Sequence, residues 1–223
     1  MNIKKKIKKI YTEQPGEHIF KKDAPYEKFI FIKLGMIFSM PLLRLICKTK
    51  IRFHPSILSA IGLLSCIFGG ISFAYNYLII GAIFFYMGLV FDLVDGPYAR
   101  LTNQYSPDIK RFDSICDRIA KATCFMGLWY SQFYLKDIWY LGFTWILIYY
   151  LIEAYATKFL PDRFVDTRNV TFTVWEVSFL IFIVGPVLNL VYYMLPLSVI
   201  LLGILYIFKS YKKYLSVESA RSG

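Results

Sequence analysis

Long apolar segments separated by short polar turns dominate the pattern of this sequence. Between Phe53 and Phe91 there is no Asp, Glu, Lys or Arg. A helix needs about 20 residues to cross the ~30 Å hydrocarbon core of a bilayer. The stretch is therefore long enough for two spans, and the turn around Asn76 is expected to separate them.

The same alternation continues along the chain and predicts six membrane-spanning helices. Pro196 is expected to begin the last helix, because a proline at the first helical position loses no hydrogen bond. The predicted spans are residues 55–75, 77–100, 107–135, 138–158, 171–193 and 196–213.

The segment before the first span is basic and amphipathic. Residues 1–24 are expected to form a basic tail, and residues 25–52 mix apolar and basic positions at helical spacing. This pattern favours a helix that lies in the membrane interface, although an amphipathic helix packed on the protein has the same pattern. The predicted fold is an all-α integral membrane bundle. Its parts are residues 1–52 (tail and interfacial helix), 53–214 (six-helix transmembrane catalytic domain) and 215–223 (cytoplasmic tail).

Composition and charge agree with a membrane location. Hydrophobic residues make up 57% of the chain and the mean hydropathy is +0.49, whereas soluble domains are roughly 45–50% apolar. The net charge is +11, and half of the 26 Lys and Arg precede the first span. We interpret this charge as attraction to anionic lipid and not to nucleic acid. Most other basic residues fall in loops on the same side, which predicts a multi-pass protein with both termini in the cytoplasm.

Four aspartates flank the short loop between the predicted second and third spans. Asp92 and Asp95 are three residues apart, and Asp113 and Asp117 are four apart, so each pair shares a helix face. A short loop makes the two helices antiparallel neighbours. The four carboxylates are therefore expected to converge at the cytoplasmic membrane surface.

Such a cluster needs compensation, since charge inside a bilayer costs several kcal/mol or more. Two divalent cations would neutralise it, and oxygen-only ligands favour Mg²⁺, Mn²⁺ or Ca²⁺. The alternative is that these are helix-end charges paired with nearby bases: Arg100, Arg111, Arg118 and Lys121. The four cysteines include no CxxC pair, so neither a zinc site nor a disulfide framework is expected.

The region resembles the signature of the CDP-alcohol phosphotransferase family. The matching pattern is Asp92-x-x-Asp95-Gly96-x-x-Ala99-Arg100 followed by Asp113-x-x-x-Asp117. The one departure is Ile109, where the family has its second glycine. The start of the first span, which includes Ser59, is also similar to the family pattern.

The resemblance implies an enzyme of phospholipid biosynthesis that cleaves a CDP-alcohol, usually CDP-diacylglycerol. A substituted phosphate passes to an acceptor alcohol, CMP leaves, and the enzyme is a homodimer in its membrane. Asp117 would be the catalytic base. Two Mg²⁺ or Mn²⁺ ions would be held by Asp92, Asp95, Asp113 and Asp117. The CDP group would be bound by Asp95, Gly96, Ala99 and Arg100.

The acceptor alcohol is not defined by the sequence. Lys121 lies one helical turn after Asp117 and is expected either to contact substrate phosphate or to form a neutralising ion pair. Lys158 and Arg163 are candidates for binding a phosphorylated acceptor, or belong to a solvated basic loop. Glu153, in the fourth predicted span, is expected to face the bundle interior, since a carboxylate is costly in lipid.

Two other functions remain open at this stage. An intramembrane prenyltransferase also uses metal-bound aspartates, but its motifs differ and its bundle usually has more spans. A cation transporter would place carboxylates along a pathway through the membrane, whereas these four gather near one surface.

Overall fold

A computed structural model gives the fold of most of the chain. The described residues are 30–48, 53–159, 165–166, 171–172 and 174–221. The predicted basic tail and Arg163 lie outside them.

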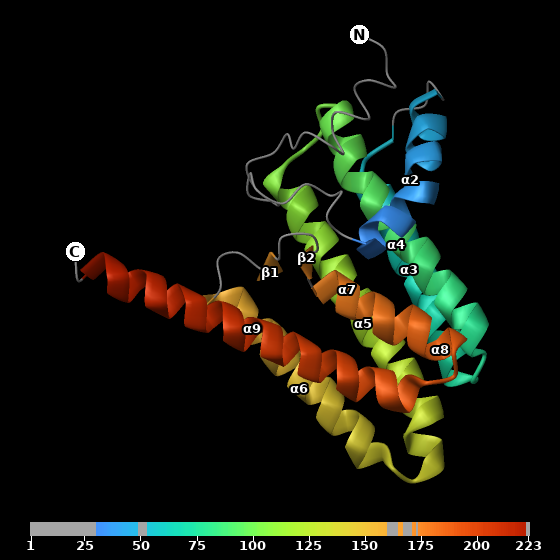
Figure 1. Cartoon of the computed structure of the whole chain (residues 1–223). Helices are drawn as coiled ribbons and strands as arrows, with labels where there is room; N and C mark the ends of the chain where they lie inside the picture. Colours follow the sequence, from blue (N-terminus) through green and yellow to red (C-terminus); the bar gives the residue numbers. More distant parts are fainter. Residues whose placement is uncertain (1–29, 49–52, 160–164, 167–170, 173, 222–223) are drawn as a thin grey trace.

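The first two predicted spans form an antiparallel pair of helices (Figure 1). Helix α3 covers Ser56–Ala74 and helix α4 covers Leu78–Leu101, each within one residue of its predicted bounds. Both are long and apolar enough to cross a membrane. The turn between them contains Asn76 at φ 64°, a left-handed conformation that asparagine tolerates.

Helices α5 (Pro107–Gln132) and α6 (Trp139–Phe159) continue the up-and-down path. Ser106 caps α5, because its side chain accepts a hydrogen bond from the Ile109 N–H at 3.3 Å. Pro107 occupies the first turn, where it loses no helical hydrogen bond. A short 3₁₀ turn, η2 (Tyr134–Lys136), leads into α6.

Glycines allow α3 to lie directly against α5. A Cβ added at Gly70 would lie 2.6 Å from the carbonyl oxygen of Thr123, and one at Gly127 would collide with the carbonyl of Gly70. Small residues permit this backbone approach between membrane helices. Since α3 also packs extensively on α4, it fixes α4 and α5 relative to each other.

The C-terminal half corrects the predicted boundary between the last two helices. Pro196 does not begin a helix but lies inside α9 (Val191–Arg221). The chain turns instead at Asn189, whose φ is 54°, and the Leu190 N–H donates to the Gly185 carbonyl at 2.7 Å. Helix α9 extends as far as Arg221.

The segment before that turn is not one regular helix. It comprises α7 (Val174–Phe179), a π-helical stretch η3 (Leu180–Val184) and α8 (Gly185–Val187). It is preceded by a pair of two-residue antiparallel strands, β1 (Val165–Asp166) and β2 (Thr171–Phe172). The fold is therefore α-helical, with one minimal strand pair within the described residues.

Helix α2 (Ile30–Lys48) packs against α4 (Figure 1). The Tyr86 hydroxyl donates to the Leu34 carbonyl at 2.8 Å, and Leu43 is buried beside Val94 and Tyr98. Contact with the protein is thus part of the role of this helix, and its place in the membrane interface stays a prediction.

The core is aromatic and the exterior is apolar. The ring of Phe182 lies 4.6 Å from the rings of both Phe85 and Phe125, measured between centroids. Large exposed apolar side chains occur on every long helix, among them Phe68, Ile83, Met126, Leu147 and Ile204. An apolar exterior this extensive is typical of a surface in contact with lipid.

Candidate metal and substrate site

Three of the four aspartates predicted to converge meet between α4 and α5. One carboxylate oxygen of each of Asp92, Asp95 and Asp113 lies within 4.8 Å of the other two. Asp92 and Asp95 are on the last turns of α4, and Asp113 is on the second turn of α5. The i,i+3 spacing and the short intervening loop produce this arrangement.

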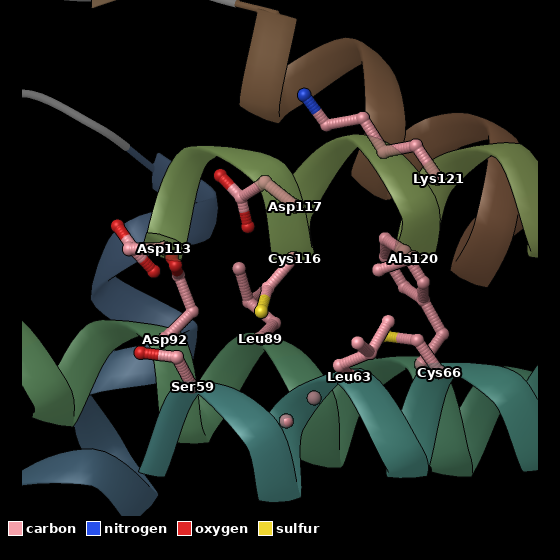
Figure 2. A pocket seen from close by; sticks show the side chains of 13 residues that line it. Ser59, Leu63, Cys66, Leu89, Asp92, Asp113, Cys116, Asp117, Ala120 and Lys121 are labelled. Atoms are coloured by element: carbon pink, nitrogen blue, oxygen red, sulfur yellow. The ribbon is translucent and has the colours of Figure 1, made fainter. Parts of the chain in front are cut away.

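Asp92 and Asp113 line a cavity between α3, α4 and α5. Asp117, one turn farther along α5, lines the same cavity (Figure 2). It is not one of the three carboxylates of the tight cluster. The cavity is narrow, about 30 Å³, and its inner wall includes the thiols of Cys66 and Cys116. Both thiols are buried and free.

The cluster fits a hard divalent cation. Ligands on opposite sides of a metal bound at about 2.0–2.5 Å lie roughly 4–5 Å apart, which matches the spread of the three carboxylate oxygens. The three grouped ligands are all carboxylates, which suit Mg²⁺ or Mn²⁺.

Ser59 is a site residue that the sequence reasoning did not assign. Its hydroxyl, on the first turn of α3, donates to Oδ2 of Asp95 at 2.6 Å, and both side chains are buried. Partners of this kind orient metal-binding carboxylates. Ser59 lay in the motif at the start of the first span, but a pattern along the chain does not show that α3 reaches the carboxylates.

Lys121 forms an ion pair across two helices. Its Nζ atom lies 3.6 Å from a carboxylate oxygen of Glu153 on α6, and the two side chains are only 11% and 23% exposed. In Figure 2 the amine extends back along α5 in the direction of Asp117. Of the two predicted roles, the ion pair is therefore observed, with Glu153 as the partner. Glu153 is half-buried against α5, as expected for a carboxylate in this bundle.

The predicted CDP-binding segment forms the C-terminal end of α4. Ala99 is buried, and the Arg100 guanidinium lies over Gly96, since a Cβ at Gly96 would be 3.7 Å from Nη1 of Arg100. That is an ordinary contact distance, so the packing of this chain does not require glycine at this position. The Nε atom of Arg100 is buried and has no hydrogen-bond partner among the described residues.

The remaining candidate residues lie near the start of α5 or at the end of α6. Lys158 is on the last turn of α6, and its side chain is outside the described set. Arg111, one of the bases considered as a partner for the carboxylate cluster, instead pairs with Asp108 at 3.9 Å. Ile109 occupies the first turn of α5 and is half-buried.

Comparisons with known proteins agree with this architecture. The sequence profile of the CDP-alcohol phosphatidyltransferase family matches residues 52–209. The fold is similar to phosphatidylinositol phosphate synthase of Mycobacterium tuberculosis with CDP-DAG bound (TM-score 0.59, 18% identity, 78% of this chain and 92% of that chain). It is also similar to the apo form of that enzyme (TM-score 0.54, 19% identity, 79% and 94%). No curated protein sequence matches the chain.

Proposed function

The chain belongs to the CDP-alcohol phosphatidyltransferase family, and we propose that it transfers a phosphatidyl group from CDP-diacylglycerol to an acceptor alcohol and releases CMP. As a family member it is a phosphatidyltransferase-type enzyme of phospholipid biosynthesis. The observation that carries the proposal is the meeting of Asp92, Asp95 and Asp113 within 4.8 Å, from the two helices that hold the family motif.

The donor is proposed to bind over the cytoplasmic end of α4. The solved enzyme with CDP-DAG bound supports a donor of this class. Gly96 lets a ligand approach the backbone, and the Arg100 guanidinium can form paired hydrogen bonds with a phosphate. The group proposed to bind CDP is Asp95, Gly96, Ala99 and Arg100.

Two Mg²⁺ or Mn²⁺ ions are proposed to be held by Asp92, Asp95, Asp113 and Asp117. When bound, the ions supply positive charge to the diphosphate oxygens as the bond between the two phosphates breaks. Ser59 keeps the Asp95 carboxylate in place through its hydrogen bond. Asp117 is proposed to accept the proton of the acceptor hydroxyl. The hydroxyl oxygen then bonds to the phosphorus that carries diacylglycerol.

The acceptor is proposed to lie on the Asp117 side of the cavity. Lys121 lines this side, and Lys158 and Arg163 are kept as candidates for an acceptor phosphate. The enzyme is a membrane protein, proposed to have six spans, an interfacial α2, cytoplasmic termini and a homodimeric assembly. The inside-positive charge pattern supports the orientation.

The direct test is CMP release from CDP-diacylglycerol by the purified protein. We expect release only with Mg²⁺ or Mn²⁺, its loss on chelation, and its recovery when either ion is restored. Asp117→Asn should reduce release at least a hundredfold with an unchanged thermal unfolding curve. The matched control is Asp108→Asn on the same helix, an exposed aspartate outside the cavity. CMP release that survives chelation would contradict the metal requirement. CMP release that survives Asp117→Asn would contradict the assignment of Asp117 as the base.

A further inference from the structure

A groove of about 690 Å³ lies between α5 and α6. It is separate from the carboxylate cavity and larger. Its apolar lining includes Phe125, Met126 and Ile146, and its polar lining is Arg118, Tyr150 and Glu153. A groove of this size is large enough for one hydrocarbon chain together with part of a polar group.

The charged residues of the groove lie at one end, and the other end is lined by apolar side chains. Arg118 and Glu153 are nearer the cytoplasmic ends of α5 and α6, and Met126 and Ile146 lie nearer the opposite ends. From Arg118 to Met126 the helix rises about 12 Å, enough for an acyl chain of eight or more carbons. The charged end of the groove matches the polar head group of a lipid, and the apolar end matches its hydrocarbon chain.

Two polar groups in the groove favour a phospholipid as the occupant. Arg118 is exposed on a helix that we propose crosses the membrane, where an arginine is stabilised by an anionic lipid phosphate. The Tyr150 hydroxyl is buried at the groove wall without a hydrogen-bond partner among the described residues. Because an unsatisfied hydroxyl is costly in an apolar setting, we expect a head-group or ester oxygen to reach it once a lipid is bound.

The polar end of the groove meets the Asp117 side of the reaction site. Glu153 lines the groove, and its ion-pair partner Lys121 lines the carboxylate cavity. Arg118 directly follows Asp117 in the chain. The nucleotide of the donor is proposed to lie over α4, on the other flank of the carboxylates. A lipid in the α5–α6 groove is therefore placed as the second substrate.

We propose that the acceptor is itself a membrane glycerophospholipid with a free head-group hydroxyl, bound in the groove between α5 and α6. The inference rests on the proposed function. The head-group O–H loses its proton to Asp117, and its oxygen bonds to the phosphorus that carries diacylglycerol. The bond from that phosphorus to the oxygen bridging to CMP breaks, and CMP leaves with the electron pair. The product is a phospholipid that carries both diacylglycerol units.

The test uses the full-length protein in detergent micelles with CDP-diacylglycerol and Mg²⁺. Phosphatidylglycerol serves as the lipid acceptor, and glycerol 3-phosphate, inositol 1-phosphate and serine serve as soluble acceptors. Met126→Trp fills the groove, and Met87→Trp makes the same change at an exposed position on α4. Phosphatidylglycerol with a photoreactive acyl chain reports occupancy of the groove without any need for turnover.

The proposal expects CMP release with phosphatidylglycerol and crosslinks on peptides of α5 and α6. Met126→Trp should raise the KM for phosphatidylglycerol at least fivefold and remove the crosslinks, with the donor KM unchanged. Met87→Trp should change neither the KM for phosphatidylglycerol nor the crosslinks. Tyr150→Phe should raise the same KM by a smaller factor, and Tyr140→Phe, an exposed tyrosine outside the groove on α6, should not.

Other results overturn the inference in distinguishable ways. Release with a soluble acceptor that Met126→Trp leaves unchanged, or no crosslinks on α5 and α6, rejects the lipid acceptor and leaves the proposed function intact. A raised KM for CDP-diacylglycerol in Met126→Trp would assign the groove to an acyl chain of the donor. Loss of dimerisation in Met126→Trp at unchanged KM assigns it to a second copy. No CMP release with any acceptor counts against the proposed function as well.

Discussion

At the scale of single residues, Ser59 links α3 to the carboxylate cluster. Its hydrogen bond to Asp95 is 2.6 Å long and buried, and loss of such a partner typically weakens metal binding about 10–100-fold. We expect Ser59→Ala to raise the Mg²⁺ concentration for half-maximal CMP release by about that factor. Ser72→Ala removes an exposed hydroxyl that bonds only within α3 and is the control. An unchanged Mg²⁺ dependence would contradict the role of Ser59.

Gly96 offers a test of donor binding that leaves the fold in place. A Cβ there meets only the end of the Arg100 side chain, at 3.7 Å, so Gly96→Ala should not alter thermal unfolding. The added methyl group lies where the nucleotide is proposed to approach the backbone. We expect the KM for CDP-diacylglycerol to rise about tenfold, equivalent to about 1.4 kcal/mol of binding. Equal donor KM values for variant and parent would remove Gly96 from the donor site.

The aspartate cluster was predictable from the sequence, and its neighbours were not. The spacing of Asp92, Asp95 and Asp113 on two helices joined by a short loop is local information. The contacts of Ser59 with Asp95, and of Lys121 with Glu153, join residues far apart in the chain. They depend on how α3 and α6 pack beside α4 and α5, which no local pattern encodes.

At the scale of elements, the contact between Gly70 and Gly127 sets the distance from α3 to α5. Gly127→Ala would push its methyl group into the Gly70 carbonyl, and overpacking typically costs about 1–3 kcal/mol. We expect a lower unfolding temperature in detergent and reduced CMP release, because Asp113 moves with α5. Gly203→Ala, whose methyl would meet only the tip of Ile152 at 3.4 Å, should be tolerated. Equal stability of the two variants would argue against a close α3–α5 contact.

Helix boundaries were predicted well where a turn signal and an apolar block coincide. The ends of α3 and α4 flank Asn76, and Pro107 begins α5 as expected. The last boundary failed because Pro196 was interpreted as a helix start, while the chain turns at Asn189. Neighbouring helices can supply hydrogen bonds to the backbone groups that a proline leaves free within a membrane helix. The π-helical stretch before that turn packs against α4 and α9, contacts that the sequence pattern does not reveal.

At the scale of the whole molecule, three turns meet at the end of the bundle opposite the carboxylates. The Gln132 side-chain amide donates to Asn76 at 2.5 Å and accepts from Lys136 at 3.2 Å. The Tyr192 hydroxyl donates to the Gln132 carbonyl, and Lys136 lies over the Tyr192 ring. The α3–α4 turn, the α5–α6 turn and the start of α9 are therefore joined. Alternate connections lie at opposite ends, as in an up-and-down membrane bundle.

This arrangement predicts which residues face the outside of the membrane. Tyr75 and Tyr193 are exposed at the joined turns, and Tyr105 is exposed in the loop beside the carboxylates. In a variant without the four native cysteines, Tyr75→Cys and Tyr193→Cys should react with an impermeant thiol reagent in intact cells. Tyr105→Cys should react only after permeabilisation, because the basic loops are retained in the cytoplasm. Labelling of Tyr105→Cys alone in intact cells would invert the proposed orientation. Labelling of all three would mean that the helices between them do not cross the bilayer.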